Sequence, residues 1–314
     1  MKKWLKEYLV CPECLPREIP LDLAISDELD DDVTDGDLTC PGCEKSFPVR
    51  MGVAVILPER SRKVLNEPSG YNSRSMLSAY LWSHYCDLFP DPDAADAYQQ
   101  WSSLFKGSNG LALDIGCAVG RLAFELSKAH TRVIGVDTSL SFIKNARTLL
   151  TQKRLSLDLI IEGLITKGHS FESSSNWNHD RTDFIVADAL ALPFPKSLFS
   201  TVSSINILEK ISNPILHLTE VNRVLDKKDA MFVFSDPFSW DETVLSPDLW
   251  IGGNNAGKYK GRGTDCMGRI FSGEDGVFDP PLEITIKGDV SWKIRKTENL
   301  WEHIRSQFLV GIRR

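Results

Sequence analysis

The chain has 314 residues, of which 42% are hydrophobic and 25% charged, and its formal net charge is −7 at pH 7. These values are ordinary for a globular protein with one large core and a smaller module. The longest aliphatic run near the start, 53–57, is too short to span a bilayer, and the first residues lack the apolar stretch of a signal peptide. We therefore expect a cytoplasmic protein that does not cross a membrane.

The acidic charge is concentrated in residues 1–60, which hold 7 Lys/Arg and 13 Asp/Glu. Nucleic-acid binding requires a basic face that displaces counterions from phosphates. This composition argues against a nucleic-acid partner, although a local basic patch is compatible with an acidic total. It allows a basic protein partner.

Two Cys-Pro-x-Cys pairs, Cys11/Cys14 and Cys40/Cys43, lie in the same segment. In a cytoplasmic chain this pattern predicts metal binding rather than a disulfide framework. Four thiolates can bind Zn²⁺ tetrahedrally and supply folding energy to a small module. Four free buried thiols are the alternative, while a redox dithiol would need only one pair. We predict a zinc-ribbon module over 1–60, with the acidic stretch 26–37 as a protruding loop.

Residues 61–108 are expected to form a polar linker and a helical lid. Tyr71, Tyr80 and Tyr85 recur at helix-like intervals, and prolines interrupt the pattern before a second helix at about 94–105. His84 stands alone on the first helix, where a buried structural histidine is commoner than a catalytic one.

From residue 109 to 314, α and β patterns alternate. Strands are expected at 111–115, 132–137, 157–161, 200–206, 230–235, 283–295 and 306–313, and helices near 119–129, 139–153 and 213–225. The polar stretch 163–182 is expected to be a surface loop.

The stretch from Asp114 to Gly120 carries the strongest functional signal. An apolar run ends in Asp114, and a turn with Gly116 and Gly120 leads into an amphipathic segment. The two glycines let the backbone turn sharply beside a ligand. A second apolar run ends in Asp137, which is placed to accept hydrogen bonds from a ribose diol. The nicotinamide fingerprint G-x-G-x-x-G is absent.

This D-x-G-x-x-x-G order followed by Asp137 resembles the S-adenosylmethionine site of class I methyltransferases, with Ala118 at the usual middle glycine. The resemblance implies a doubly wound, seven-stranded, Rossmann-like α/β sheet with an antiparallel strand inserted last. It also implies S-adenosylmethionine as cofactor. The cofactor-binding residues expected on this basis are Asp114, Gly116, Cys117, Ala118, Gly120, Asp137, Thr138, Asp188, Ala189 and Asn206.

The same resemblance suggests roles for individual side chains. Asp188 would contact the adenine amino group and the Ala189 amide a ring nitrogen, although Asp188 could simply cap the next segment. Asn206 would lie beside the transferable methyl and orient a polar nucleophile. Glu209 is either a base or a helix acid favoured by the dipole. Tyr71 and Tyr80 would close over the cofactor, so these two and Asn206 are the predicted catalytic residues.

A closer resemblance covers about residues 71–314. The segments around Tyr71–Tyr85, Leu113–Arg121, Ser235–Trp240 and Trp250–Gly253 resemble the mercaptohistidine N-methyltransferase of ovothiol biosynthesis, as does Trp292–Thr297. The tryptophans of the loop region at 240–250 could build an apolar wall at the crevice, or they could equally be ordinary core residues. The chain departs from that enzyme in carrying the cysteine module where a sulfoxide synthase is usually fused, and in reading Asp-Lys-Lys-Asp-Ala at 226–230.

The module itself is similar to the ribbons of small methyltransferase activator proteins and of some ribosomal-RNA guanine methyltransferases. We therefore expect a methyltransferase acting on a small polar nucleophile, such as a nitrogen or sulfur of a thiolated imidazole. The alternative is an RNA or protein methyltransferase that recognises its substrate through the ribbon. A non-enzymatic binding protein is disfavoured by the intact Asp114, Gly116, Gly120 and Asp137.

Overall fold

The computed structural model describes residues 1–66, 70–107 and 110–314, and the expected boundary at 108/109 and the end of the expected linker lie outside these residues. Within them, one sheet of 11 strands has the order β1-β2-β3-β4-β9-β6-β5-β10-β11-β13-β12. A separate two-stranded sheet joins β7 to β8.

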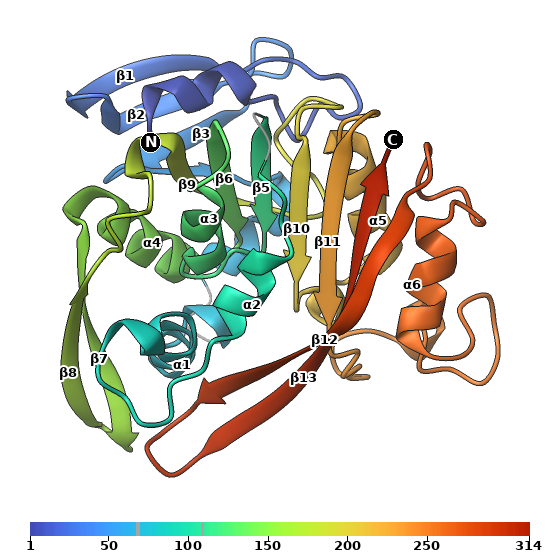
Figure 1. Ribbon diagram of the computed structural model, residues 1–314. Helices are drawn as coiled ribbons and strands as arrows, with labels where there is room; N and C mark the ends of the chain where they lie inside the picture. The colour runs from blue at the N-terminus through green and yellow to red at the C-terminus, as the bar shows by residue number, and fades with distance from the viewer. Residues whose placement is uncertain (67–69, 108–109) are drawn as a thin grey trace.

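Seven neighbouring strands form the central part of the large sheet (Figure 1). They are β9 (Thr182–Ala187), β6 (Arg132–Asp137), β5 (Leu111–Ile115), β10 (Thr201–Ile205), β11 (Ala230–Asp236), β13 (Trp301–Arg313) and β12 (Glu283–Arg295). The first five run parallel, and β13 pairs antiparallel with both β11 and β12. The expected doubly wound sheet with its inserted antiparallel strand is thus confirmed.

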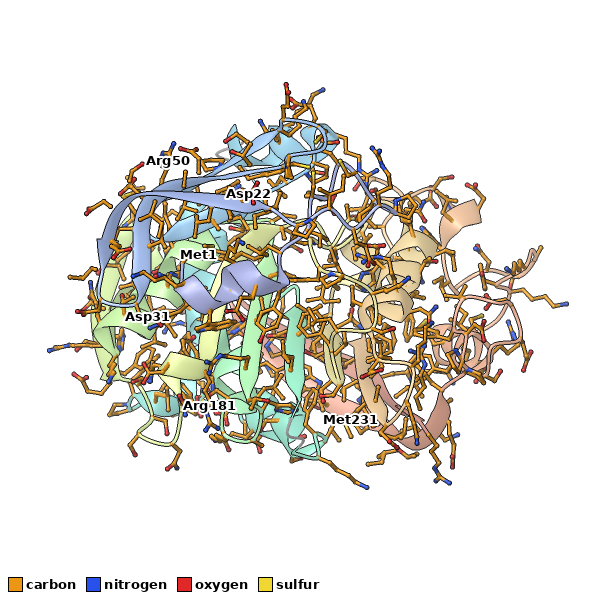
Figure 2. The ribbon with its side chains drawn as sticks, turned by 90° about the horizontal axis from the view of Figure 1, so that it is seen from above. Met1, Asp22, Asp31, Arg50, Arg181 and Met231 are labelled. Atoms are coloured by element: carbon orange, nitrogen blue, oxygen red, sulfur yellow. The ribbon has the colours of Figure 1, made fainter. Side chains whose placement is uncertain are left out.

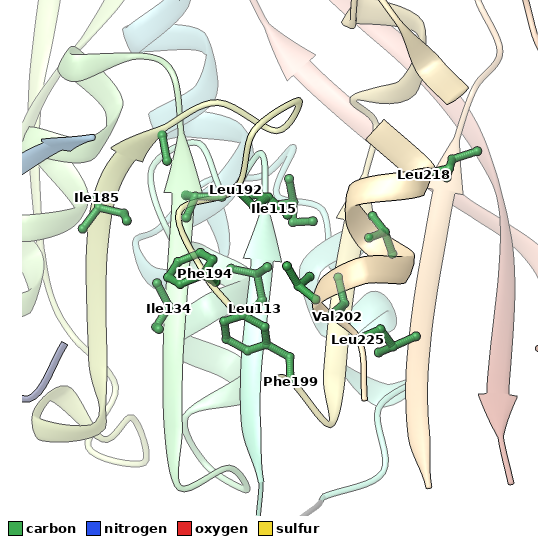
Figure 3. Close-up of a cluster of buried hydrophobic side chains, with 14 of the residues drawn as sticks. Leu113, Ile115, Ile134, Ile185, Leu192, Phe194, Phe199, Val202, Leu218 and Leu225 are labelled. Atoms are coloured by element: carbon green, nitrogen blue, oxygen red, sulfur yellow. The ribbon is translucent and has the colours of Figure 1, made fainter. Parts of the chain in front are cut away.

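Alternating side chains of the central strands enter two separate cores. Leu113 and Ile115 pack on one face, whereas Ala112 packs on the other. This division follows from the two-residue period of a strand. Figure 3 shows the first core, where strand residues such as Leu113 meet Phe194 and Phe199.

Helices cover both faces. They are α1 (Arg74–Tyr85), α2 (Ala97–Ser103), α3 (Arg121–Leu126), α4 (Leu140–Gln152), α5 (Pro214–Val224) and α6 (Gly263–Phe271). The Ser139 hydroxyl caps α4 by accepting from the Phe142 N–H, and the Asn213 side chain caps α5. Short 3-10 helices are η1 (Lys3–Tyr8), η2 (Glu59–Asn66), η3 (Gly70–Asn72), η4 (Cys86–Leu88), η5 (His179–Arg181), η6 (Leu208–Lys210) and η7 (Pro247–Leu249).

The strands of the N-terminal module continue the large sheet at one edge. These strands are β1 (Asp22–Leu29), β2 (Asp32–Thr39), β3 (Ser46–Arg50) and β4 (Val53–Ile56), and β4 pairs in parallel with β9. Figure 2 shows the module from above, with its hairpin running from Asp22 to the turn at Asp31. Since the connection 188–200 between β9 and β10 forms no helix, Leu9 and Phe47 of the module share a core with Phe194 on that face.

Three expectations about residues 1–182 are wrong. The stretch 157–161 does not enter the large sheet, because β7 (Arg154–Glu162) pairs with β8 (Ile165–Glu172) in a separate hairpin, and the third central strand is β9. Burial alternates along β7 but is continuous along β9, as expected for a half-exposed and a central strand. Residues 165–172 are therefore not a loop, and 26–37 mostly belongs to β1 and β2.

The two hairpins enclose α1. The β7–β8 hairpin and the outer parts of β12 and β13 lie on either side of it in Figure 1. Their tips meet where the Glu298 N–H donates to the Ile161 carbonyl at 3.1 Å. In addition, the Ser83 hydroxyl donates to the Lys293 carbonyl at 2.8 Å. These contacts hold α1 over the carboxyl ends of the central strands.

Candidate functional site

A cavity of about 500 Å³ lies where four parallel strands end. The last residues of β5, β6, β9 and β10 line it, and side chains from α1, α2, α4 and β12 form its opposite wall. Nine of the predicted cofactor and catalytic residues line this cavity: Tyr71, Tyr80, Gly116, Ala118, Asp137, Thr138, Asp188, Ala189 and Asn206. The sheet therefore brings together residues that lie up to 135 positions apart in sequence.

The glycine turn forms one edge of the cavity. Gly116 has φ +71°, and a Cβ there would lie 2.3 Å from Cγ2 of Ile207. Gly120 has φ +92°, and its Cβ would meet Phe184 at 2.7 Å. Any larger side chain would be strained in conformation and would clash. Ala118 also has positive φ, 47°, so this turn tolerates alanine at the position where the family commonly has glycine.

The carboxylate of Asp137 organises the turn. Its Oδ2 accepts from the Ala118 N–H at 3.0 Å, and its Oδ1 accepts from the Ser139 N–H at 2.8 Å. Burial raises the pKa of Asp137 to about 6. Each oxygen keeps further accepting capacity, so the carboxylate can also accept from hydroxyl groups of a ligand.

Asp114, Cys117 and Gly120 are the predicted cofactor residues that do not line the cavity. Asp114 accepts from the Ser203 hydroxyl at 2.7 Å, and burial raises its pKa to about 7. Asp114 is only 2% exposed. We therefore place these three residues behind the turn, where they shape it from within the core.

Asn206 combines backbone strain with an unpaired polar atom. It has φ +58°, its N–H donates to the Ser235 carbonyl at 2.7 Å, and it lines the cavity. Its Oδ1 is buried and has no hydrogen-bond partner among the described residues. Strained residues and unsatisfied buried groups cluster at functional sites, which agrees with the predicted location of this residue in the site.

An aromatic wall faces the strand ends. The Tyr80 ring lies 5.8 Å from that of Tyr71, 4.9 Å from that of Phe142 and 5.9 Å from that of Trp292, centroid to centroid. All four residues line the cavity. Burial raises the pKa of both tyrosines, so their hydroxyls remain protonated near neutral pH. Such rings favour a cationic group placed against their faces.

Sequence reasoning missed the pair His84 and Tyr98, which also line the cavity. The Tyr98 hydroxyl lies 2.5 Å from His84 Nε2. Burial and the nearby Arg121 charge lower the pKa of His84 well below its usual value, and burial raises that of Tyr98. The sequence did carry one signal that His84 lies in this wall. It follows Tyr80 by four residues and therefore lies on the same face of the helix.

Two other candidates lie outside the cavity lining. Glu209 forms an ion pair with Lys210 at 2.9 Å and accepts from the Ser239 N–H. The rings of Trp240 and Trp250 stack at 5.9 Å, and the Trp250 indole donates to the Leu245 carbonyl at 2.8 Å. The cavity lining thus includes neither Glu209 nor the two tryptophans, which favours the alternatives of a structural acid and ordinary core packing.

The four cysteines of the N-terminal module form one cluster. All four sulfur atoms lie within 4.8 Å of one another. Cys11 Sγ is 3.7 Å from Cys43 Sγ, and Cys14 Sγ is 3.8 Å from Cys40 Sγ. Four convergent thiols are the donor set of a structural zinc site.

Residues 113–234 match the model of a family described as a methyltransferase domain. Similar solved structures include an S-adenosylmethionine-dependent methyltransferase from Methanosarcina mazei (17% identity, 67% of this chain and 95% of that one, TM-score 0.44). Another is from Aquifex aeolicus (11% identity, 76% and 98%, TM-score 0.43). A putative methyltransferase from Bacillus halodurans is 11% identical over 69% and 99%, with TM-score 0.45.

The matched residues span β5 to β11, which carry the glycine turn and the ends of the central parallel strands. The chain therefore contains a methyltransferase domain over residues 113–234. No helix in the described part of the chain has the length and apolar character to cross a membrane.

Proposed function

We propose that this methyltransferase acts on a small polar nucleophile, such as a nitrogen or sulfur atom of a thiolated imidazole. The cavity supports this because its wall opposite the strand ends is aromatic, and the polar side chains in that wall, which include Tyr80, His84 and Tyr98, are uncharged in their buried setting. A neutral acceptor avoids the cost of burying an unpaired charge there.

In this proposal the cofactor lies across the strand ends. Gly116 and Ala118 admit its methionine portion, Asp137 accepts from the ribose hydroxyls, and Asp188 with Ala189 contacts the adenine.

Thr138 flanks the ribose, and Asn206 orients the acceptor beside the methyl group. Tyr71 and Tyr80 cover the cofactor, while Asp114, Cys117 and Gly120 hold the turn from behind.

Methyl transfer needs an acceptor lone pair aligned with the methyl–sulfur bond, and alignment with water exclusion supplies much of the rate. The aromatic wall would exclude water, and the Asn206 amide would fix the acceptor. A neutral imidazole nitrogen already presents a free lone pair and needs no proton removal before the transfer. This is consistent with the position of Glu209 outside the cavity lining.

Incubation with methyl-labelled S-adenosylmethionine tests the acceptor class. The candidates are mercaptoimidazoles, imidazoles, bulk RNA and basic proteins. We expect label on a mercaptoimidazole or an imidazole, and Asn206→Ala should reduce the transfer. Label on RNA or protein alone would instead support macromolecular recognition through the ribbon.

We also propose that Cys11, Cys14, Cys40 and Cys43 bind one Zn²⁺. The convergent sulfur atoms support this assignment. The residue ranges 1–60, 61–108 and 109–314 remain our proposed division into ribbon, lid and methyltransferase domain. The ribbon's exposed acidic strand β1 leaves a basic protein partner open.

A further inference from the structure

The segment η2 connects the cysteine module to the cavity. It begins at Glu59, at the end of the module, and two of its residues, Arg60 and Ser61, line the cavity. This short segment therefore contacts both the cysteine module and the cavity.

On the cavity side, η2 holds the residue predicted to contact adenine. The Ser61 hydroxyl donates to Asp188 Oδ2 at 2.5 Å. Asp188 Oδ1 accepts from the Leu190 N–H at 2.8 Å, and the Leu190 carbonyl accepts from the Arg60 guanidinium at 3.1 Å. Both oxygens of the carboxylate are thus oriented, one by η2 directly and one by a loop that η2 also holds.

On the module side, η2 is fastened beside both cysteine pairs. The Glu59 N–H donates to Oε1 of Glu13 at 2.6 Å, and Glu13 lies between Cys11 and Cys14. Close to Cys43, Lys45 donates to the Glu59 carboxylate at 3.2 Å.

A second attachment is made by Arg62, three residues after Glu59. The Arg62 guanidinium donates to the Ser46 carbonyl at 3.0 Å and lies 5.8 Å from the centroid of the Phe47 ring. The position of η2 therefore depends on the loops that carry the thiols.

We propose that the cysteine module is part of the cofactor site: through η2 it sets the wall at the adenosine end, with Ser61 as a positioning residue for Asp188. This inference rests on the proposed placement of the cofactor in the cavity. It assigns the module a role in binding the methyl donor in addition to any role in recognising the acceptor.

Calorimetry with two probes tests this proposal. S-adenosylhomocysteine contains adenosine and the amino-acid tail, whereas 5′-methylthioadenosine lacks the tail. Ser61→Ala should weaken the binding of both probes by a similar factor, about fivefold, since a hydrogen bond to a charged group is lost. A loss confined to S-adenosylhomocysteine would overturn the assignment, because it would place η2 at the methionine end.

Variants within the module separate positioning from general damage. Glu13→Ala should weaken both probes about threefold, and Glu13→Gln should restore near-normal binding because its amide oxygen still accepts from the Glu59 N–H. The matched control is Glu7→Ala, since Glu7 is also an exposed acid of the module and should leave binding unchanged. Circular dichroism confirms that each variant is folded.

The cofactor placement and the role of η2 can be refuted separately. If the wild-type protein binds neither probe, the cofactor placement itself is wrong. If the wild type binds both probes, and folded Ser61→Ala and Glu13→Ala bind them equally well, the placement stands and the role of η2 is refuted. Removal of bound metal with a chelator should likewise weaken 5′-methylthioadenosine binding in protein that remains folded, and unchanged binding would count against the coupling.

Discussion

The hydroxyl of Tyr98 and Nε2 of His84 lie 2.5 Å apart and join α2 to α1 at the wall of the cavity. Both side chains are buried, at 9% and 3% exposure. With the pKa of His84 lowered and that of Tyr98 raised by burial, the pair is a neutral hydrogen bond rather than an ion pair. It fixes the two lid helices relative to each other.

Tyr98→Phe should therefore destabilise the protein. The change removes one hydroxyl and leaves His84 Nε2 without this partner, at a cost of about 1–3 kcal/mol for a buried unsatisfied group. Urea denaturation measures the free energy of unfolding. Tyr8→Phe, in the half-exposed η1 segment, is the control and should change it by less than about 0.5 kcal/mol. Equal stability of Tyr98→Phe and wild type would contradict this prediction.

Asp137→Ala should weaken S-adenosylhomocysteine binding at least tenfold, about 1.4 kcal/mol. The change removes the proposed acceptor for the ribose hydroxyls and also the two hydrogen bonds that hold Ala118 and Ser139. Isothermal calorimetry measures the affinity. Asp180→Ala, at a side chain 95% exposed, should leave it unchanged. Unaltered affinity in Asp137→Ala would show that the ribose lies elsewhere.

The buried Asp114 predicts a pH dependence of stability. Burial raises its pKa from the ordinary value of 3.8 to about 7, so the folded state binds this proton more tightly than the unfolded state. The stability that the Asp114 carboxyl group contributes is fully present below about pH 4, and it is lost as the pH rises through about 7. Asp114→Asn should therefore become more stable relative to wild type between pH 4 and 8. Denaturation of both proteins at several pH values measures this difference, and a pH-independent difference would refute the prediction.

The sequence predicted the central sheet well because its signals are local. A buried run that ends in an acid and a glycine turn identifies a strand and its ligand edge, as at Asp114 and Gly116. The β7–β8 hairpin could not be placed in this way. Its alternating residues are compatible with any half-buried strand, and only its partners decide which sheet it joins.

The rest of the site depends on long-range packing. His84 and Tyr98 lie on separate helices, and nothing in either helix alone indicates that they meet. The attachment of the cysteine module is similar, since β4 joins β9 across more than 120 residues. Residues 188–200 form no helix. The face of the sheet beside β9 is therefore left for another segment, the cysteine module, to cover.

The cysteine cluster predicts one zinc ion per chain. Metal analysis of protein purified without added metal should give a stoichiometry near one, and Cys40→Ser should reduce it strongly because the buried Cys40 contributes one of the four thiols. Cys266→Ser is the matched control, since that buried cysteine lies outside the cluster. A folded wild-type protein without zinc, or with iron instead, would refute the assignment.

The module and the methyltransferase domain share a buried ion cluster, which gives a final prediction. The Arg147 guanidinium on α4 pairs with Asp32 of β2 at 2.6 Å and with Asp183 of β9. The side chain of Asp183 is fully buried and that of Arg147 is 5% exposed. Removal of the arginine leaves two carboxylates without their shared partner, and breaking a buried pair in this way costs about 3–5 kcal/mol.

Arg147→Leu should therefore lower the free energy of unfolding by several kcal/mol in urea denaturation. The control is Arg154→Leu, because Arg154 pairs with Glu172 at 3.6 Å with side chains 60% and 71% exposed. An exposed pair contributes about 0–1 kcal/mol, so this variant should stay close to wild type. High salt should change the stability of Arg147→Leu relative to wild type only slightly, since buried pairs are weakly screened. Similar losses in the two variants would mean that Arg147 does not stabilise the junction between module and domain.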